Sequence, residues 1–191
     1  MEKQIDFYFD LVSPYSYVAS MLIDDVALRG NAKVNWKPFL LGGVFKAVGT
    51  TEAPGLHPAK KPYLLKDLQR LSVHLKIPIK MPPDFPVRTV LAMRTLCGFN
   101  ADEIPQAANT LYKAYWVKNM DIADPDVVAS LVGRDAVEQA GIQEIKDKLF
   151  QSTEEAVRRG AFGAPTFFVK DEMFFGYDRL ALLELHLNGQ I

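Results

Sequence analysis

The sequence of 191 residues contains a single cysteine, Cys97. One thiol cannot form a disulfide within the chain, so the fold must be stable without one. The same shortage excludes dithiol redox chemistry inside one chain, because that chemistry uses two thiols. We therefore expect a reducing, cytoplasmic setting. Cys97 lies on a predicted helix with Met93 and Leu96, and we interpret it as a buried apolar thiol.

The chain also lacks an excess of either charge, with 22 Lys and Arg against 23 Asp and Glu and a formal net charge of −1. A nucleic-acid-binding surface usually shows a basic excess, so we expect no nucleic-acid partner. No apolar run reaches the roughly 18 residues that a membrane span requires, and residues 1–4 lead into a predicted strand without a signal-peptide core. The histidines, His57, His74 and His186, have no ligand spacing, so we expect no metal site.

Strand signals are present at the N-terminal end of the chain. Residues 4–11 are strongly β-prone, and residues 15–29 have helical spacing that stops at Gly30. Residues 32–38 alternate like a half-buried strand. This order within about 40 residues predicts a parallel strand pair joined by a right-handed crossover.

Strand signals return only near the C-terminus. Residues 166–169 and 172–175 predict a hairpin that turns at Lys170-Asp171, and a last helix is expected to open at Asp178. Between the two ends, residues 43–62 predict short helix and loop, and helical patterns follow over residues 62–76, 87–99, 104–119, 125–132, 133–140 and 142–159.

Taken together, the predicted elements favour an α/β protein with a thioredoxin-like fold. The terminal order is strand, helix, strand, then helix, hairpin and helix. We expect a discontinuous thioredoxin-like domain from residues 1–42 and 160–191. The intervening residues 43–159 would form a large, all-helical insertion domain.

The loop after the first strand contains Ser13-Pro14-Tyr15-Ser16, at the position where redox relatives of this fold carry Cys-x-x-Cys. Serine at the N-cap, proline at the first helical position and serine at the third are typical of a helix start. The tetrapeptide alone therefore indicates a helix cap.

A second signal lies just before the C-terminal hairpin, where Ala164-Pro165 precedes Thr166. In this fold a proline at that position is usually cis and faces the active-site loop, although only about 5–6% of X–Pro bonds in folded proteins are cis. Alone, Pro165 is equally well explained as the first residue of a strand. The pairing with the serine turn is more specific than either half.

With these segments, the chain resembles the family of 2-hydroxychromene-2-carboxylate isomerases and kappa-class glutathione transferases. The matching segments are FYFDLVSPYSY, YLLKDLQRLSVHLKIPI, AYWVKNMDIADP and GAFGAPTFFVKDEMFFGYDR, and the match covers nearly the whole chain. Members of this family are DsbA-like, thioredoxin-fold enzymes with a helical insertion, and they use glutathione as cofactor or substrate. The resemblance implies the same fold and cofactor here, and a homodimer.

In this family the first serine of the turn interacts with the glutathione sulfur, which implies that role for Ser13. Ser16 is then expected to serve the helix cap. The backbone of Ala164, before Pro165, offers an edge for the glutathione peptide. Tyr177 belongs to the family's Gly-x-Asp-Arg corner.

The charged ends of glutathione need partners too. Asp178 at a helix start suits the γ-glutamyl ammonium, although an N-cap aspartate explains it equally well. Lys60 matches a glutathione-binding lysine of the kappa branch, and its neighbour Lys61 is the alternative. Thr51 stands where kappa relatives have asparagine, which puts that contact in question.

A pocket for a planar aromatic carboxylate is expected between the insertion and Ser13. Each candidate is equally well explained as a core or surface residue. The candidate walls are Tyr15, Phe39, Phe85 and Trp116, and the candidate cation is Arg88.

Ser13 has no evident base beside it in the sequence, so we interpret it as a hydrogen-bond donor to a thiolate and not as a nucleophile. A helix N-terminus contributes ~0.3–1 kcal/mol to a nearby anion, and a hydrogen bond to a charged group ~1.5–3 kcal/mol. Together they would lower a thiol pKa by ~1–2 units.

The function expected from the sequence is a glutathione-dependent isomerase in aromatic compound catabolism, acting on 2-hydroxychromene-2-carboxylate or a similar intermediate. The alternative is a kappa-class transferase that conjugates glutathione to electrophiles. A non-catalytic glutathione-binding module is a further alternative. A thiol–disulfide oxidoreductase is disfavoured because the chain has one cysteine.

Overall fold

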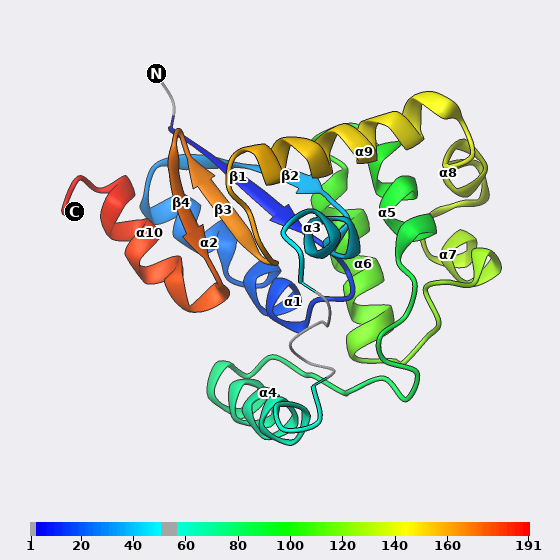
Figure 1. Cartoon of the computed structure of the whole chain (residues 1–191), viewed down its shortest axis with the longest axis horizontal. Coiled ribbons are helices and arrows are strands. Elements are labelled where there is room, and N and C mark those ends of the chain that lie inside the picture. The colour runs from blue at the N-terminus through cyan, green and yellow to red at the C-terminus, as the bar shows by residue number, and fades with distance from the viewer. Residues whose placement is uncertain (1–2, 51–56) are drawn as a thin grey trace.

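The computed structural model describes residues 3–50 and 57–191 (Figure 1). Its strands are β1 (Lys3–Phe9), β2 (Ala32–Pro38), β3 (Thr166–Val169) and β4 (Glu172–Phe175). The helices are α1 (Pro14–Ser20), α2 (Ile23–Arg29), α3 (Leu41–Ala47), α4 (Lys61–Leu75), α5 (Val90–Cys97), α6 (Ile104–Trp116), α7 (Pro125–Val132), α8 (Arg134–Gln139), α9 (Gln143–Arg158) and α10 (Leu180–Leu187), with a 3-10 turn, η1 (Tyr177–Arg179), before α10.

The four strands form one mixed sheet in the order β2-β1-β3-β4. β1 and β2 run parallel, with Phe7 opposite Trp36, and this confirms the predicted parallel pair. β3 runs antiparallel to β1, with Tyr8 opposite Thr166, and β4 completes the predicted hairpin. The sheet therefore joins the two ends of the chain and brings the segment before Thr166 to the carboxyl end of β1.

The sequence predicts one helix over residues 15–29, and this is wrong because the stretch forms two helices, α1 and α2. The N–H groups of Met21 and Leu22 donate to carbonyls three residues back, at 3.2 and 3.0 Å. These tight 3-10 bonds end α1 after less than two full turns beyond its start. The Ser20 hydroxyl also donates to a backbone carbonyl, that of Tyr17, at 2.8 Å.

The two faces of β1 bury different residues, as the alternation of a strand requires. Phe7 and Phe9 belong to the large core that includes α1, α2 and α6, and the Phe7 ring stacks on Phe167 with centroids 5.0 Å apart. Tyr8 faces the opposite way, into a smaller core with Phe168. Strand β3 is buried throughout, whereas the edge strand β4 keeps Glu172 and Phe175 exposed.

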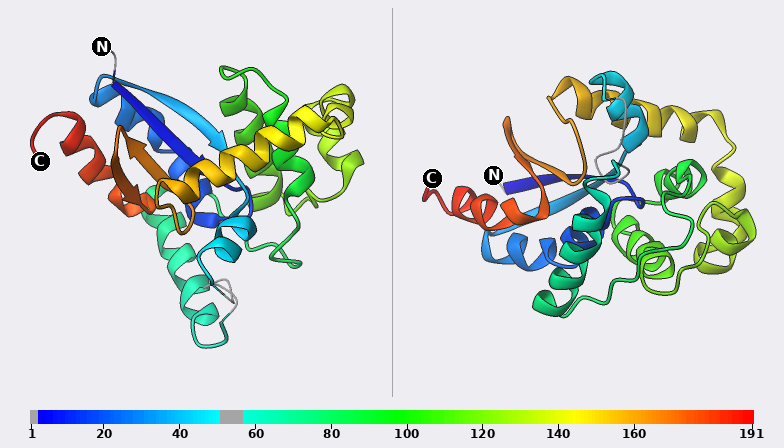
Figure 2. Two further views of the ribbon diagram at one scale, coloured as in Figure 1. Left: turned by 45° about the horizontal axis from the view of Figure 1, so that its top comes forward. Right: turned by 60° about the horizontal axis from the view of Figure 1, so that its bottom comes forward.

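Helices α5 to α8 lie together beside the sheet, and α9 runs from this group back across to the strands (Figures 1 and 2). Helix α4 stands apart from the other helices in Figure 1 and in the left view of Figure 2. The buried face of α4, formed by Leu64, Leu68 and Leu71, packs against Tyr15 and Tyr177. Within residues 3–50 and 57–191 we find no helix that is both long and apolar enough to cross a membrane.

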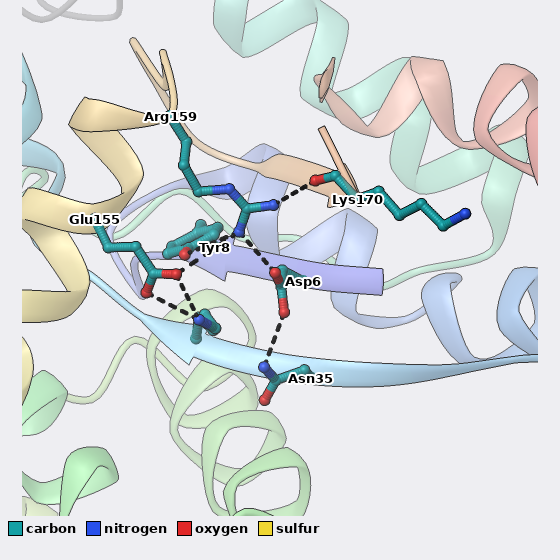
Figure 3. Close-up of polar contacts among 7 residues, drawn as sticks. Asp6, Tyr8, Asn35, Glu155, Arg159 and Lys170 are labelled. Carbon is teal, nitrogen blue, oxygen red and sulfur yellow. Dashed lines mark hydrogen bonds and ion pairs between the residues drawn. The ribbon is translucent and has the colours of Figure 1, made fainter. Parts of the chain in front are cut away.

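A polar network ties the end of α9 to the sheet (Figure 3). Arg159 pairs with Asp6 at 2.7 Å and donates to the Lys170 carbonyl at 2.7 Å. Its guanidinium also lies 4.0 Å from the centroid of the Phe168 ring. On the same face, Lys37 pairs with Glu155 of α9 at 2.9 Å. These contacts hold α9 in place over the strands.

Candidate active site

Ser13 is the N-cap of α1 and lies at the end of the loop that follows β1. Its backbone is extended (φ −85°, ψ 117°), and its hydroxyl oxygen accepts a hydrogen bond from the Ser16 N–H at 3.1 Å. Pro14 occupies the first turn, as predicted. The expectation that Ser16 serves as the cap is wrong, because Ser16 contributes only its N–H and its own hydroxyl is buried beside the Tyr112 hydroxyl.

Ser13 meets the second sequence signal directly. The Ser13 hydroxyl donates to the Ala164 carbonyl at 3.1 Å, and the Ala164–Pro165 peptide bond is cis, as predicted. The turn is fixed on its other side by the Thr166 hydroxyl, which donates to the Gly163 carbonyl at 2.8 Å. The fold thus brings the serine turn and the Ala164-Pro165 turn into contact, at one end of the sheet.

Tyr15 and Tyr177 lie at the edge of this contact, and they are both partly buried. Their rings stack nearly parallel, with centroids 5.7 Å apart. The Tyr15 hydroxyl donates to the Asp67 carboxylate of α4 at 3.2 Å. Burial raises the pKa of both tyrosines, and the neighbouring Asp67 raises them further. Both phenols are therefore neutral donors at physiological pH.

Asp178 lies in η1 and is exposed, and its carboxylate pairs with Arg179 at 2.8 Å. The last helix begins two residues later than predicted, so Asp178 is not its N-cap. Lys60 is exposed at the start of α4, next to Lys61. Thr51 lies outside the described residues.

The five residues proposed for the second substrate do not share one environment. Phe39 and Trp116 are fully buried. Phe39 packs on Tyr8 with ring centroids 5.9 Å apart, and the Trp116 indole donates to the Leu11 carbonyl at 2.9 Å. Both belong to the protein core, where large aromatic rings bury the most area.

The other three residues of that set keep accessible surface. Tyr15 and Phe85 are partly buried, and Arg88 is exposed. Phe85 lies against Trp116 with centroids 5.8 Å apart. A second cis peptide bond, Phe85–Pro86, was not anticipated from the sequence.

Asp10 and its partners also belong to this region and were missed by the sequence interpretation. Asp10 is the last residue before the serine loop and is 2% exposed. Its carboxylate accepts hydrogen bonds from Thr89 at 2.7 Å and from the Leu41 N–H at 2.9 Å. The available signal was an acidic residue inside the apolar run FYFDLV, since a buried carboxylate needs partners.

Comparison with known proteins identifies the family. The sequence matches the DSBA-like thioredoxin domain over residues 4–188. The chain belongs to the DsbA-like thioredoxin family. It is 31% identical over 211 residues to human glutathione S-transferase kappa 1, covering 100% of this chain and 92% of that protein.

Two isomerases support the same placement within the DsbA-like family. The chain is 29% identical over 196 residues to 2-hydroxychromene-2-carboxylate isomerase of Sphingobium xenophagum, covering 98% of this chain and 99% of that protein. A solved structure of a 2-hydroxychromene-2-carboxylate isomerase superposes with a TM-score of 0.86 at 26% identity, covering 97% of this chain and 95% of the other. The family and fold expected from the sequence are confirmed.

Proposed function

We propose that this DsbA-like protein is a glutathione-dependent isomerase. Its substrate would be 2-hydroxychromene-2-carboxylate, converted to trans-o-hydroxybenzylidenepyruvate, or a similar intermediate of aromatic compound catabolism. The observation that carries the proposal is the 3.1 Å contact between the Ser13 hydroxyl and the Ala164 carbonyl at the start of α1. Full-length relatives named 2-hydroxychromene-2-carboxylate isomerase support the reaction type.

The groups around this contact suit glutathione. Ser13 offers a hydroxyl donor for a sulfur anion, and the first turn of α1 contains no acidic residue that would repel it. The exposed carboxylate of Asp178 suits an ammonium group, and the exposed Lys60 suits a carboxylate. Ala164, Pro165 and Tyr177 would lie along the peptide.

Ser13 has the hydrogen-bonding capacity for this role. A hydroxyl has one donor and two acceptor positions. One acceptor position holds the Ser16 N–H, and the donor points to the Ala164 carbonyl. Rotation of the hydroxyl redirects its proton to an anion without breaking the helix cap. Charge-assisted hydrogen bonds are roughly twice as strong as neutral ones, so a thiolate competes well with the carbonyl.

When bound beside Ser13, glutathione would supply a thiolate nucleophile for reversible addition to a conjugated double bond, chemistry that isomerises a substrate and regenerates the cofactor. The role of the protein is to keep the sulfur ionised and to orient the substrate. Tyr15, Phe85 and Arg88 would contact that substrate, since they keep accessible surface.

A kappa-class glutathione transferase is the second candidate. The observation that favours it is the 31% identity to the human kappa enzyme over the full length of this chain. In that case the same Ser13 would stabilise the same thiolate, but the adduct with an electrophile would be released as product. A cytoplasmic homodimer is part of either proposal.

One experiment separates these functions. The purified protein is incubated with glutathione and either 2-hydroxychromene-2-carboxylate or a chlorodinitrobenzene electrophile. Substrate and products are separated by chromatography, and each is identified by its mass and its absorbance spectrum. Isomerase activity gives a product of unchanged mass and undiminished glutathione, whereas transferase activity gives a glutathione adduct. Binding of glutathione in a calorimetric titration without turnover of either substrate would instead indicate a non-catalytic module.

A further inference from the structure

Asp10 joins the serine loop to segments that lie far away in the sequence. One carboxylate oxygen accepts hydrogen bonds from the Val12 N–H at 3.1 Å and from the Thr89 hydroxyl at 2.7 Å. The other accepts from the Leu41 N–H at 2.9 Å. The side chain thus contacts the loop itself, the first residue of α3 and the N-cap of α5.

The backbone of Asp10 extends the same set of contacts. Its carbonyl accepts from the Ser13 N–H at 3.0 Å and from the Tyr112 hydroxyl of α6 at 3.3 Å. The Trp116 indole holds the next carbonyl, that of Leu11. Leu11, Val12 and Ser13 therefore each make a hydrogen bond either to Asp10 or to a side chain of α6.

Thr89 donates to Asp10 in place of the capping hydrogen bond that a threonine at this position usually makes. Thr89 is the N-cap of α5, where a threonine hydroxyl ordinarily accepts from a helix N–H. Here the hydroxyl makes no capping hydrogen bond and donates to Asp10. Asp10 and Thr89 are 2% and 5% exposed, so the pair is shielded from water.

We infer that Asp10 is a positioning residue that fixes Ser13 relative to the helical insertion. Three donors hold the Asp10 carboxylate in one orientation. The backbone carbonyl of Asp10 in turn accepts from the Ser13 N–H and so fixes the position of Ser13. The orientation of the Ser13 side chain toward Ala164 and the Ser16 N–H then follows from the insertion. The importance of this orientation for catalysis rests on the proposed function. The orientation itself does not.

Asparagine at this position would disturb the arrangement for a definite reason. Its amide has one acceptor oxygen and one donor nitrogen. With the oxygen toward Leu41, the nitrogen opposes the Val12 N–H. With the oxygen toward Val12, the nitrogen opposes the Leu41 N–H. In either orientation one buried backbone donor loses its acceptor.

The first test reads the position of residue 13 without glutathione. In a Ser13→Cys background the ionisation of the introduced thiol is followed by thiolate absorbance between pH 4 and 9, with and without Asp10→Asn. Burial raises the pKa of Cys97 to about 12, so the native thiol does not titrate in this window. A thiolate at the N-cap is stabilised by the Ser16 N–H only if the loop is held in place.

Two possible roles of Asp10, positioning of the loop and a simple charge effect, predict opposite shifts in the pKa of the introduced thiol. Loss of positioning raises the pKa of the introduced thiol by about one unit, a tenfold change in its acid dissociation constant. Removal of a nearby negative charge alone would lower that pKa, because a like charge disfavours the thiolate. We expect the rise. A fall or an unchanged value in the folded variant would overturn the inference.

Matched variants separate positioning from general destabilisation. Asp6→Asn removes a carboxylate from the same strand that pairs with Arg159 and Asn35 (Figure 3), and it should leave the thiol pKa unchanged. Thr89→Val should reproduce the direction of the Asp10→Asn shift, and Thr89→Ser should not, because serine keeps the hydroxyl. If Asp10→Asn does not fold, the Thr89 pair decides the outcome.

A second test uses the native Ser13. With glutathione and the isomerase substrate, Asp10→Asn should lower kcat by about tenfold, the same factor as the thiol shift, while KM for the substrate changes less than twofold. Failure of the wild-type protein to bind glutathione would refute the proposed function alone, since the titration of the introduced thiol does not depend on it. Full activity of Asp10→Asn beside an active wild type would refute the positioning role alone.

Discussion

The Tyr15 ring stacks nearly parallel to the Tyr177 ring, with centroids 5.7 Å apart and planes inclined by 6°. Tyr15 comes from the first turn of α1 and Tyr177 from η1, so the stack joins the N-terminal and C-terminal parts of the candidate site. The same two rings support the leucine face of α4. The attachment of α4 therefore depends on residues of the site.

Loss of this stack should loosen α4 selectively. We expect Tyr177→Ala to speed amide hydrogen exchange in α4 by roughly 3- to 10-fold, because stacking contributes ~0.5–1.5 kcal/mol beyond area burial. Exchange in β1 and β3 should be unchanged. Mass-spectrometric hydrogen exchange measures both, and Tyr177→Phe, which keeps the ring, is the control. Equal acceleration in the sheet and in α4 would contradict the prediction.

Replacement of Ser13 should lower turnover by orders of magnitude while the fold survives. Ser13→Ala removes the donor to the thiolate, and loss of one such preorganised donor costs roughly 10²–10³ in kcat. Loss of the N-cap hydrogen bond costs only ~1 kcal/mol of stability. Turnover with glutathione and thermal unfolding followed by circular dichroism measure the two effects.

Ser16→Ala is the matched control for Ser13→Ala, because Ser16 takes part in the cap only through its backbone N–H, which donates to the Ser13 hydroxyl oxygen and which alanine keeps. We expect Ser16→Ala to retain activity within a few-fold. The reverse pattern, in which Ser16→Ala is inactive and Ser13→Ala is fully active, would show that the thiolate partner is assigned to the wrong serine.

The Arg159 network should matter for stability and not for catalysis. Arg159→Ala removes the ion pair with Asp6, the bond to the Lys170 carbonyl and the contact with the Phe168 ring. We expect a loss of ~1–3 kcal/mol in the free energy of unfolding, since a partly buried carboxylate is left without its cation. Urea unfolding measures this. The neighbour Arg158 is exposed, and Arg158→Ala should change stability by less than ~0.5 kcal/mol.

Asp10 should make stability depend on pH. Burial raises the pKa of Asp10 above its ordinary value, although the donors from Leu41, Thr89 and Val12 lower it in part. The folded chain then binds more protons than the unfolded chain between the two pKa values. The contribution of Asp10 to stability is therefore fully present below the unfolded pKa and is lost as pH rises through the folded pKa.

The stability difference between the wild type and Asp10→Asn isolates this effect from other carboxyl groups. We expect the wild type to lose stability relative to Asp10→Asn as pH rises from the unfolded pKa of aspartate, about 4, through the folded pKa. Urea unfolding at each pH measures this difference. A difference that stays constant over the acidic range would show that burial does not shift this carboxyl.

Cys97 should be chemically inert in the folded protein. Cys97 is partly buried and not fully buried as expected, but this burial still raises its pKa to about 12, against about 8.5 for a free thiol. Because the thiolate is the reactive species, alkylation by iodoacetamide at pH 8 should be roughly 10³-fold slower than for the same chain in urea. Mass spectrometry of the labelled protein measures both rates. Similar rates in the two states would mean that Cys97 is accessible when folded.

The elements that the sequence predicted correctly are those with local causes. The β1–β2 pair and the hairpin follow from strand alternation and a short turn. The tetrapeptide Ser13-Pro14-Tyr15-Ser16, taken alone, indicates the Ser13 cap that the structure has; the family resemblance moved that role to Ser16, and this was wrong. The cis Ala164–Pro165 bond came from fold position. Local signals of this kind need no knowledge of the rest of the chain.

The parts that the sequence did not predict depend on distant contacts. The donors to Asp10 lie as far as 79 residues away at Thr89 and 102 residues away at Tyr112, so no local pattern connects them. Phe39 and Trp116 were assigned to a pocket because aromatic residues suit a substrate and a core equally. Only packing decides between the two, and it places both in the core.

The contact between Ser13 and Ala164 also has a consequence for how the protein is made, because the two residues are 151 positions apart. At synthesis rates of about 5–20 residues per second, roughly 8 to 30 s pass between their incorporation. During that interval β1 can pair with β2. The other edge of β1 stays unpaired until β3, Thr166–Val169, has been synthesised. The candidate site is therefore among the last features of the nascent chain to be completed.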